Sequence, residues 1–341
     1  MATFDKNEEK KSVFSEARRS GTGPRMRMIK SNGINMRIAE MGEGPLVILI
    51  HGWPESWYSW RHQLPALAKS GYHAVAPDMR GYGKTDAPEK VEDYDTIHLT
   101  GDIVGIIDSL GEKNAIIIGH DWGALVAWDC MLLHPDLFRA LIAMSVPYYG
   151  RANESLIVSL KKTFGDKFYY ILYFQEYGKA EAEFDADPYA ILSRLYLSPD
   201  SPREKPELTD PKLSAGGWIP RLGKPKGLPA WLTQEDLEYY VKEFTEAGFR
   251  GGINYYRNFH RNWEITPQLE GAVIEKPVLF IAGEKDVVIR GAKEDMLKKA
   301  MSKSVKSLHG VRLFPKIGHW VQQEAPEETN REIIAFLDSL R

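Results

Sequence analysis

Residues 114–123 read Asn-Ala-Ile-Ile-Ile-Gly-His-Asp-Trp-Gly, an apolar run followed by His-Asp-Trp with one glycine on each side. The apolar run predicts a buried strand, and residues 124–129 after it predict a helix. A strand that passes into a helix through Gly-x-Asp-x-Gly predicts a sharp turn with Asp121 at its apex. Gly119 and Gly123 fit this turn because strand and helix approach each other only if these residues are small. The stretch therefore predicts an α/β protein whose Asp121 side chain stands clear of the sheet.

Aspartate occupies the position at which esterases and lipases carry serine, so the expected nucleophile is a carboxylate. A carboxylate that displaces a leaving group from an sp³ carbon forms an alkyl ester whose carbonyl belongs to the enzyme. The electrophiles that suit this attack are strained or activated, chiefly epoxides and alkyl halides. Water must then hydrolyse the ester, which requires a base. A plain turn with a surface aspartate is the simpler alternative, and suitable partners elsewhere in the chain argue against it.

The candidate base is His319 in Gly318-His-Trp, which follows an apolar strand at 311–315 and precedes a helix expected from about Pro326. Asp286 follows another strand, at 277–282, and is expected to orient the imidazole from the same edge of the sheet. Nucleophile, acid and histidine then occur in the chain order of an α/β-hydrolase triad. Glu284 is the alternative orienting residue, and placement at the strand end favours Asp286.

A loop that could bind an oxyanion follows the apolar strand 46–50 and reads His51-Gly-Trp-Pro-Glu. We expect the backbone N–H groups of Trp53 and Trp122 to be the two donors of this fold's oxyanion hole. Pro54 is a candidate for a cis peptide bond. Scaffold hydrogen bonding is the favoured interpretation of the other polar side chains nearby, His51, Glu55 and His120.

With these motifs in view, the chain resembles the epoxide hydrolases of the α/β-hydrolase fold, specifically the catalytic domain of soluble forms in mammals, plants and bacteria. The resemblance covers most of the chain and rests on residues 51–62, 78–86, 119–123, 173–176, 256–258, 261–263 and 318–320. It implies conversion of an epoxide and water to a vicinal diol through a covalent ester on Asp121. One departure is Ala124, where many relatives have a second glycine.

The resemblance also implies two lid tyrosines that hydrogen-bond the epoxide oxygen. By motif position these are Tyr170, three residues before Tyr-Phe-Gln-Glu, and Tyr256, which opens Tyr-Arg-Asn. Tyr169 and Tyr173 remain alternatives to the first, and Tyr255 is the neighbour of the second. An aromatic stripe at helical spacing packs far more often than it catalyses, so only the motif singles out these two.

Two other functions stay open. A haloalkane or haloacid dehalogenase would use the same Asp-His-Asp triad, but it needs halide donors such as indole N–H groups where the resemblance implies phenols. A ligand-binding protein of the same fold without turnover is the second alternative, which an intact triad argues against. No organic cofactor is expected, and no cluster of cysteine and histidine suggests a metal site.

Composition excludes several classes of partner. Forty-four Lys and Arg against 47 Asp and Glu give a net charge of −3, which does not suggest binding to nucleic acid or to an anionic membrane. No apolar stretch of about 20 residues occurs, and residues 1–24 show neither a signal peptide nor an anchor. We expect a cytoplasmic monomer or homodimer that acts on a small-molecule epoxide. The single cysteine, Cys130, is expected to be buried and inert.

The order of the motifs predicts a mostly parallel central sheet flanked by helices, with an inserted helical cap. Strands are expected at 25–31, 35–41, 45–50, 72–77, 114–119 and 138–144, and helices near 56–70, 96–111 and 122–134. The expected division is a polar extension over 1–24, a core over 25–146 and 264–341, and a cap over 147–263. Within the cap, 198–229 carries seven prolines and is expected to be a long surface connection, either an access lid or a solvated excursion.

Overall fold

The computed structural model describes residues 23–341, so nearly all of the extension expected over 1–24 lies outside the described residues. One eight-stranded sheet runs in the order β1-β2-β4-β3-β5-β6-β7-β8. Strand β2 pairs antiparallel with β1 and β4, and every other neighbouring pair is parallel. The strands are Arg25–Ser31, Ile34–Met41, Leu46–Ile50, His73–Pro77, Ala115–His120, Phe138–Met144, Val278–Gly283 and Leu308–Phe314. The mostly parallel sheet predicted from the sequence is confirmed.

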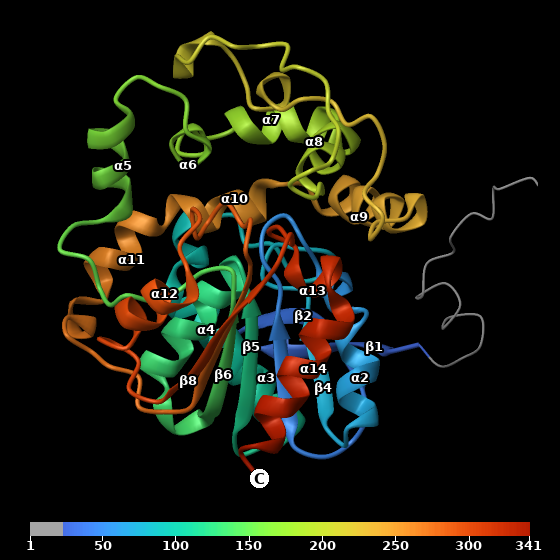
Figure 1. Cartoon of the computed structure of the whole chain (residues 1–341), viewed down its shortest axis with the longest axis vertical. Coiled ribbons are helices and arrows are strands. Elements are labelled where there is room, and N and C mark those ends of the chain that lie inside the picture. The colour runs from blue at the N-terminus through green and yellow to red at the C-terminus, as the bar shows by residue number, and fades with distance from the viewer. Residues whose placement is uncertain (1–22) are drawn as a thin grey trace, which may run out of the picture.

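Helices cover both faces of the sheet (Figure 1). Every residue of β3, β5 and β7 is buried, because central parallel strands have helices on both sides. Helix α3 packs against α4, and α14 packs against α2. The bounds of these core helices and of the shorter α12 and α13 are Gln63–Lys69 (α2), Thr96–Leu110 (α3), Trp122–Leu133 (α4), Glu294–Met301 (α12), Val321–Glu324 (α13) and Pro326–Asp338 (α14).

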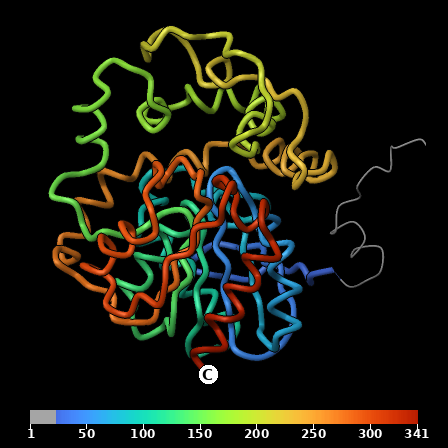
Figure 2. Tube along the Cα trace, in the orientation of Figure 1, coloured from blue at the N-terminus to red at the C-terminus, as the bar shows by residue number. Residues whose placement is uncertain are grey.

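A second layer of helices lies above one end of the sheet and comes entirely from the chain between β6 and β7 (Figures 1 and 2). The blue N-terminal part and the red C-terminal part of the described chain both lie in the sheet layer below it (Figure 2). The insertion holds helices Leu156–Phe164 (α5), Tyr170–Tyr173 (α6), Lys179–Ala186 (α7), Pro188–Leu195 (α8), Gln234–Ala247 (α9), Arg250–Arg257 (α10) and Phe259–Ile265 (α11). An inserted helical layer is what the sequence predicted.

The helix expected near 56–70 is interrupted. A 3-10 turn, Trp57–Trp60, is followed by α2, which begins only at Gln63. Pro65 explains the break, because a proline is tolerated in the first turn of a helix but removes a hydrogen bond and clashes with the preceding turn in its interior. The sequence pattern suggested one helix over 56–70, but Pro65 restricts the start of α2 to the residues just before it.

Two further observations concern the whole described chain. Cys130 is fully buried in α4, as the sequence predicted. None of the helices within residues 23–341 combines the length and the apolar character needed to cross a membrane.

Candidate active site

Asp121 lies at the sharp turn between β5 and α4, in a strained backbone conformation with φ 52° and ψ −117°. The neighbouring glycines leave no room for side chains. A Cβ on Gly119 would lie 2.1 Å from the Gly123 carbonyl oxygen, and a Cβ on Gly123 would lie 2.0 Å from the Ile50 carbonyl oxygen. The steric argument made from the sequence therefore holds, and the turn raises the Asp121 carboxylate above the sheet.

The two backbone donors predicted from the sequence both meet Asp121. The Trp53 N–H donates to Asp121 Oδ1 at 2.9 Å, and the Trp122 N–H donates to the same carboxylate. The peptide bond between Trp53 and Pro54 is cis, as expected. Gly52 brings the loop close, because a Cβ there would lie 2.5 Å from Asp121 Cβ. Asp121 Oδ1 is thus held by the Trp53 amide on the side of the loop.

His319 lies beside the other carboxylate oxygen of Asp121, with 3.7 Å between His319 Nε2 and Asp121 Oδ2. Its other ring nitrogen, Nδ1, is 3.0 and 3.2 Å from the two oxygens of Asp286, which is almost fully buried. The Val288 N–H and the Ser145 hydroxyl also donate to Asp286. Glu284, the alternative orienting residue, is exposed, and its carboxylate is near the Lys316 N–H instead.

Charge around His319 favours its protonated form. Burial alone lowers the pKa of His319, but the charge and hydrogen bond of Asp286, joined by the charge of Asp121, raise it to about 9. Burial raises the pKa of Asp121, against the opposing effects of His319 and the loop amides. For Asp286, the effect of burial is outweighed by His319, so its pKa lies below the usual value. Asp286 therefore stays ionised and holds the Nδ1 proton.

Tyr170 and Tyr256 come from separate helices of the upper layer, α6 and α10, and meet over Asp121. Their ring centroids are 5.8 Å apart, and their hydroxyl groups are hydrogen-bonded to each other. Burial and the negative charge of Asp121 raise the pKa of both phenols well above the usual value. Both therefore remain neutral hydrogen-bond donors that face a carboxylate.

The side chains of the neighbouring tyrosines Tyr173, Tyr255 and Tyr169 contact other residues. The Tyr173 hydroxyl donates to Glu183 at 2.9 Å, and the Tyr255 hydroxyl donates to the Arg80 carbonyl oxygen at 2.9 Å. The ring of Tyr169 stacks on Phe164, with centroids 4.3 Å apart. The charge of Asp121 is among the causes that raise the phenol pKa of Tyr170 and Tyr256, whereas burial and other groups raise that of Tyr173 and Tyr255.

Two indole groups matter for the choice between epoxides and halides. The Trp122 indole donates to the Tyr256 hydroxyl and meets that ring edge to face, with centroids 5.1 Å apart. The Trp53 indole N–H is buried and has no hydrogen-bond partner among the described residues. The Trp122 indole N–H is thus already hydrogen-bonded to a phenol, whereas the buried Trp53 indole N–H is unpaired within the described part of the chain.

Glu55 and His120 form a buried hydrogen-bond network behind the triad. Glu55 accepts from the Gly52 N–H at 2.9 Å and lies 2.8 Å from His120 Nδ1. His120 Nε2 is 2.8 Å from the His319 carbonyl oxygen. His51 contributes separately, because its Nε2 accepts the Met79 N–H at 3.0 Å. These bonds tie the oxyanion loop to the loop of His319, as scaffold residues do.

The sequence analysis missed Trp218, which belongs to the proline-rich stretch 198–229. Its ring is nearly parallel to Tyr170, with centroids 4.9 Å apart, and to Trp53, with centroids 5.8 Å apart. Part of the stretch is therefore packed inside the site rather than solvated. Its polar, proline-rich surroundings gave no periodic signal that could have pointed to this tryptophan.

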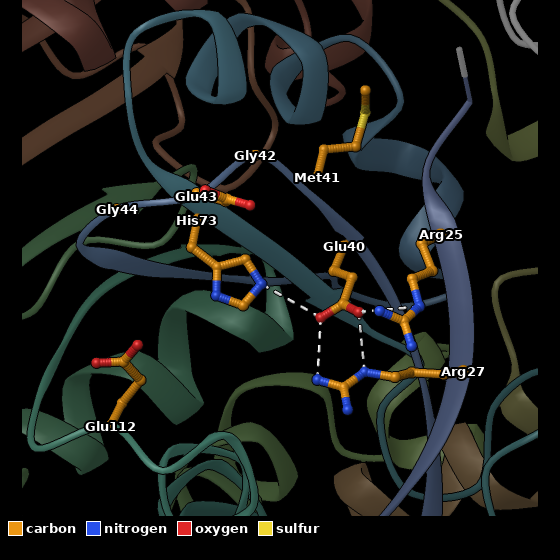
Figure 3. Close-up of a pocket in the computed structure, with 9 residues that line it drawn as sticks. All are labelled: Arg25, Arg27, Glu40, Met41, Gly42, Glu43, Gly44, His73 and Glu112. Carbon is orange, nitrogen blue, oxygen red and sulfur yellow. Dashed lines mark hydrogen bonds and ion pairs between the residues drawn. The ribbon is translucent and has the colours of Figure 1, made fainter. Parts of the chain in front are cut away.

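A separate surface hollow of about 500 Å³ lies along β1 and β2 (Figure 3). Its centre is the Glu40 carboxylate, which pairs with the guanidinium groups of Arg25 and Arg27 and with the imidazole of His73. None of the site residues predicted from the sequence lines it. Elsewhere too, residues 23–341 contain no group of three or more His, Cys, Asp or Glu side chains placed to hold a metal ion.

Comparison with known proteins identifies the family of this chain. A family model described as alpha/beta hydrolase fold matches residues 45–326. Epoxide hydrolase A of Mycobacterium tuberculosis is 45% identical over 93% of this chain and 98% of its own length. Epoxide hydrolase 3 of Siraitia grosvenorii is 41% identical over 91% of this chain and 97% of its own.

Solved structures give the same result. The crystal structure of epoxide hydrolase A from Mycobacterium thermoresistibile superposes with a TM-score of 0.86 at 45% identity, covering 92% of this chain and 98% of that one. The chain matches 54% of the longer pig bifunctional epoxide hydrolase 2, at 36% identity. The chain therefore belongs to the epoxide hydrolases of the α/β hydrolase fold.

Proposed function

We propose that this epoxide hydrolase adds water to an epoxide through a covalent ester on Asp121, and that five side chains carry the reaction. These are Asp121 as nucleophile, His319 as general base, Asp286 as its orienting partner, and Tyr170 and Tyr256 as donors to the epoxide oxygen. The observation that carries the proposal is the position of Asp121 Oδ2. It lies 3.7 Å from His319 Nε2, while Oδ1 is held by the Trp53 amide.

In the first step, Asp121 Oδ2 attacks a ring carbon and the carbon–oxygen bond of the ring breaks. The departing oxygen gains negative charge, which the hydroxyl groups of Tyr170 and Tyr256 stabilise by hydrogen bonding as it appears. Their raised pKa values support this role, because both phenols carry their protons at neutral pH.

In the second step, His319 removes a proton from water, which attacks the carbonyl carbon of the Asp121 ester. The Trp53 and Trp122 amides, which already meet the carboxylate, hold the oxyanion. Alkylation prepares the base for this step. It removes the negative charge of Asp121, one of the causes that raise the pKa of His319, and so favours the neutral imidazole that can accept a proton. Collapse of the intermediate regenerates the Asp121 carboxylate and releases the vicinal diol, whose two oxygens take up the proton held by His319 and the remaining proton of the water.

Dehalogenation is the second candidate function, and one observation favours keeping it. The buried Trp53 indole N–H has no partner among the described residues, so it is open to a halide. Against it, the Trp122 indole is engaged with Tyr256, and two phenols face Asp121. A binding protein without turnover is less favoured still, because the nucleophile, base and amide donors lie together.

A substrate panel tests the function directly. We expect aryl, aliphatic or fatty-acid epoxides to yield diols, and haloalkanes of matched size to release little halide. The wild-type enzyme would be assayed for both products, with Asp121→Asn as the control for uncatalysed hydration. Halide release without diol formation would reverse the order of the two candidates.

Further features of the sequence prediction belong to this proposal. Residues 147–263 are proposed to act as a cap domain over the core, because they supply both tyrosines while the core supplies the triad. The small-molecule substrate is proposed to enter between these two parts. A cytoplasmic location and a monomeric or homodimeric state stay predictions.

A further inference from the structure

Trp218 lies where the two functional halves of the site meet. Besides stacking on Tyr170 and Trp53, its ring meets Phe174 edge to face, with centroids 5.7 Å apart. Trp53 and Phe174 are both buried. The indole is therefore in contact with a proposed donor to the epoxide oxygen on one side and with the residue of the oxyanion loop on the other.

A single carboxylate holds Trp218 in this position. Glu183, on α7, accepts the Trp218 N–H at 2.8 Å and the Ile219 N–H at 2.9 Å. The Tyr173 hydroxyl is its third donor, at 2.9 Å. Gly217 makes this approach possible, because a Cβ there would lie 2.1 Å from Glu183 Oε1. Backbone bonds to an ionised acceptor are strong, so they fix the local geometry of the stretch.

The same stretch is also bonded to the segment that leads into Tyr170. The Phe168 N–H donates to the Pro211 carbonyl oxygen, and the Leu213 N–H donates to the Asp166 carbonyl oxygen, each at 2.7 Å. The Arg221 guanidinium lies over the Phe168 ring, 4.3 Å from its centroid. The proline-rich stretch thus contacts the Tyr170 segment in two ways. Its backbone is hydrogen-bonded to the residues that precede Tyr170, and its Trp218 ring stacks on the Tyr170 ring.

We propose that Trp218 is a positioning residue for ring opening: held by Glu183, it sets the direction in which Tyr170 presents its hydroxyl over Asp121. This inference rests on the proposed role of Tyr170 as a donor to the epoxide oxygen. A phenol ring can turn about two side-chain bonds, and a parallel indole at 4.9 Å restricts that motion. The stretch 198–229 is accordingly part of the catalytic structure rather than a passive connection.

Removing the indole should slow alkylation of Asp121 more than hydrolysis of the ester. Since a displacement of about 1 Å costs up to about 100-fold, we expect Trp218→Ala to slow alkylation on the order of 10-fold. Hydrolysis should be slowed less, because His319 is not among the ring contacts of Trp218 and the loop that carries the Trp53 amide is also held by the bonds between Gly52 and Glu55. Trp218→Phe keeps a stacking ring and should recover most of the alkylation rate. Pre-steady-state kinetics separate the two steps.

A double-mutant cycle with Tyr170→Phe identifies the path of the effect. If Trp218 acts through the Tyr170 hydroxyl, Trp218→Ala should cost little more once that hydroxyl is absent. Full additivity would overturn the inference, as would a wild-type alkylation rate in Trp218→Ala. If Tyr170→Phe alone leaves alkylation unchanged, the donor role itself is wrong, so the two failures are distinguishable.

Glu183→Gln provides a second, milder variant should the larger change impair folding. It should slow alkylation in the wild-type background and add nothing to Trp218→Ala. Two surface variants serve as controls, Tyr189→Ala on α8 and Glu238→Gln on α9, because both side chains are exposed and neither takes part in the contacts above. Equal losses in these controls, or a loss of hydrolysis as large as that of alkylation, would mean that the cap is merely destabilised.

Discussion

His319→Gln is expected to stop turnover and to leave a covalent adduct on Asp121. Ring opening needs the Asp121 carboxylate and the two phenols, all of which remain in this variant. Hydrolysis of the ester needs a proton acceptor for water, and glutamine is not one. General-base catalysis is typically worth about 10²-fold to 10⁴-fold, so the hydrolysis rate should fall by that order while alkylation continues. Intact-mass measurement with excess epoxide should show the enzyme shifted by one substrate mass.

The matched control for this experiment is His309→Gln. His309 lies on β8 and meets the ring of Phe336, and its side chain is exposed. This variant should turn over at the wild-type rate with no accumulated adduct. Unmodified His319→Gln protein, under conditions in which wild type forms diol, would contradict the two-step assignment.

Replacing both lid tyrosines, Tyr170→Phe with Tyr256→Phe, is expected nearly to abolish ring opening. The loss of one oxyanion donor costs about 10²-fold to 10³-fold in other enzymes, and each single variant here should lose on the order of 10-fold to 10³-fold. The double variant loses both phenol protons that are proposed to face the departing oxygen. Single-turnover alkylation rates, measured with the Asp121 ester as the product, would show both effects.

Variants of the neighbouring tyrosines, Tyr169 and Tyr173, test whether Tyr170 is the correct first donor. Tyr169→Phe keeps the ring that stacks on Phe164 and should leave alkylation unchanged. Tyr173→Phe removes a donor to Glu183, so it should give a smaller effect through Trp218. An unchanged rate in Tyr170→Phe, with a large loss in Tyr169→Phe or Tyr173→Phe, would mean that the first donor was misplaced.

The parts of the fold that the sequence predicted are those with a local steric or hydrophobic cause. Strand β5 was recognisable because every residue in it is buried, which requires an unbroken apolar run. The turn at Asp121 was recognisable because it requires glycine at two positions. A Cβ on Gly119 or Gly123 would lie only 2.1 or 2.0 Å from a backbone oxygen. Where a local cause competed with the pattern, as Pro65 did with the helix expected near 56–70, the apolar periodicity alone gave the wrong boundary.

The candidate site was harder to predict where it depends on contacts between distant segments. Tyr169, Tyr170 and Tyr173 lie within about one helical turn, so only the orientation of α6 decides which hydroxyl faces Asp121. Trp218 left no signal at all in the sequence. Its position depends on two hydrogen bonds, from the backbone N–H groups of Trp218 and Ile219 to Glu183 on α7, 35 positions earlier than Trp218 in the chain. Hydrogen bonds between residues so far apart in the chain leave no periodic pattern in the sequence from which they could be predicted.

In the proposed mechanism Asp121 becomes alkylated, rather than acting as a base for direct attack of water on the epoxide. A single turnover in ¹⁸O water distinguishes the two. If water attacks the carbonyl carbon of the Asp121 ester, the label should enter the Asp121 carboxylate and the first diol should carry none. Mass spectrometry of the peptide containing Asp121, and of the diol, reads both positions. Label in the first diol, with none in that peptide, would contradict the account.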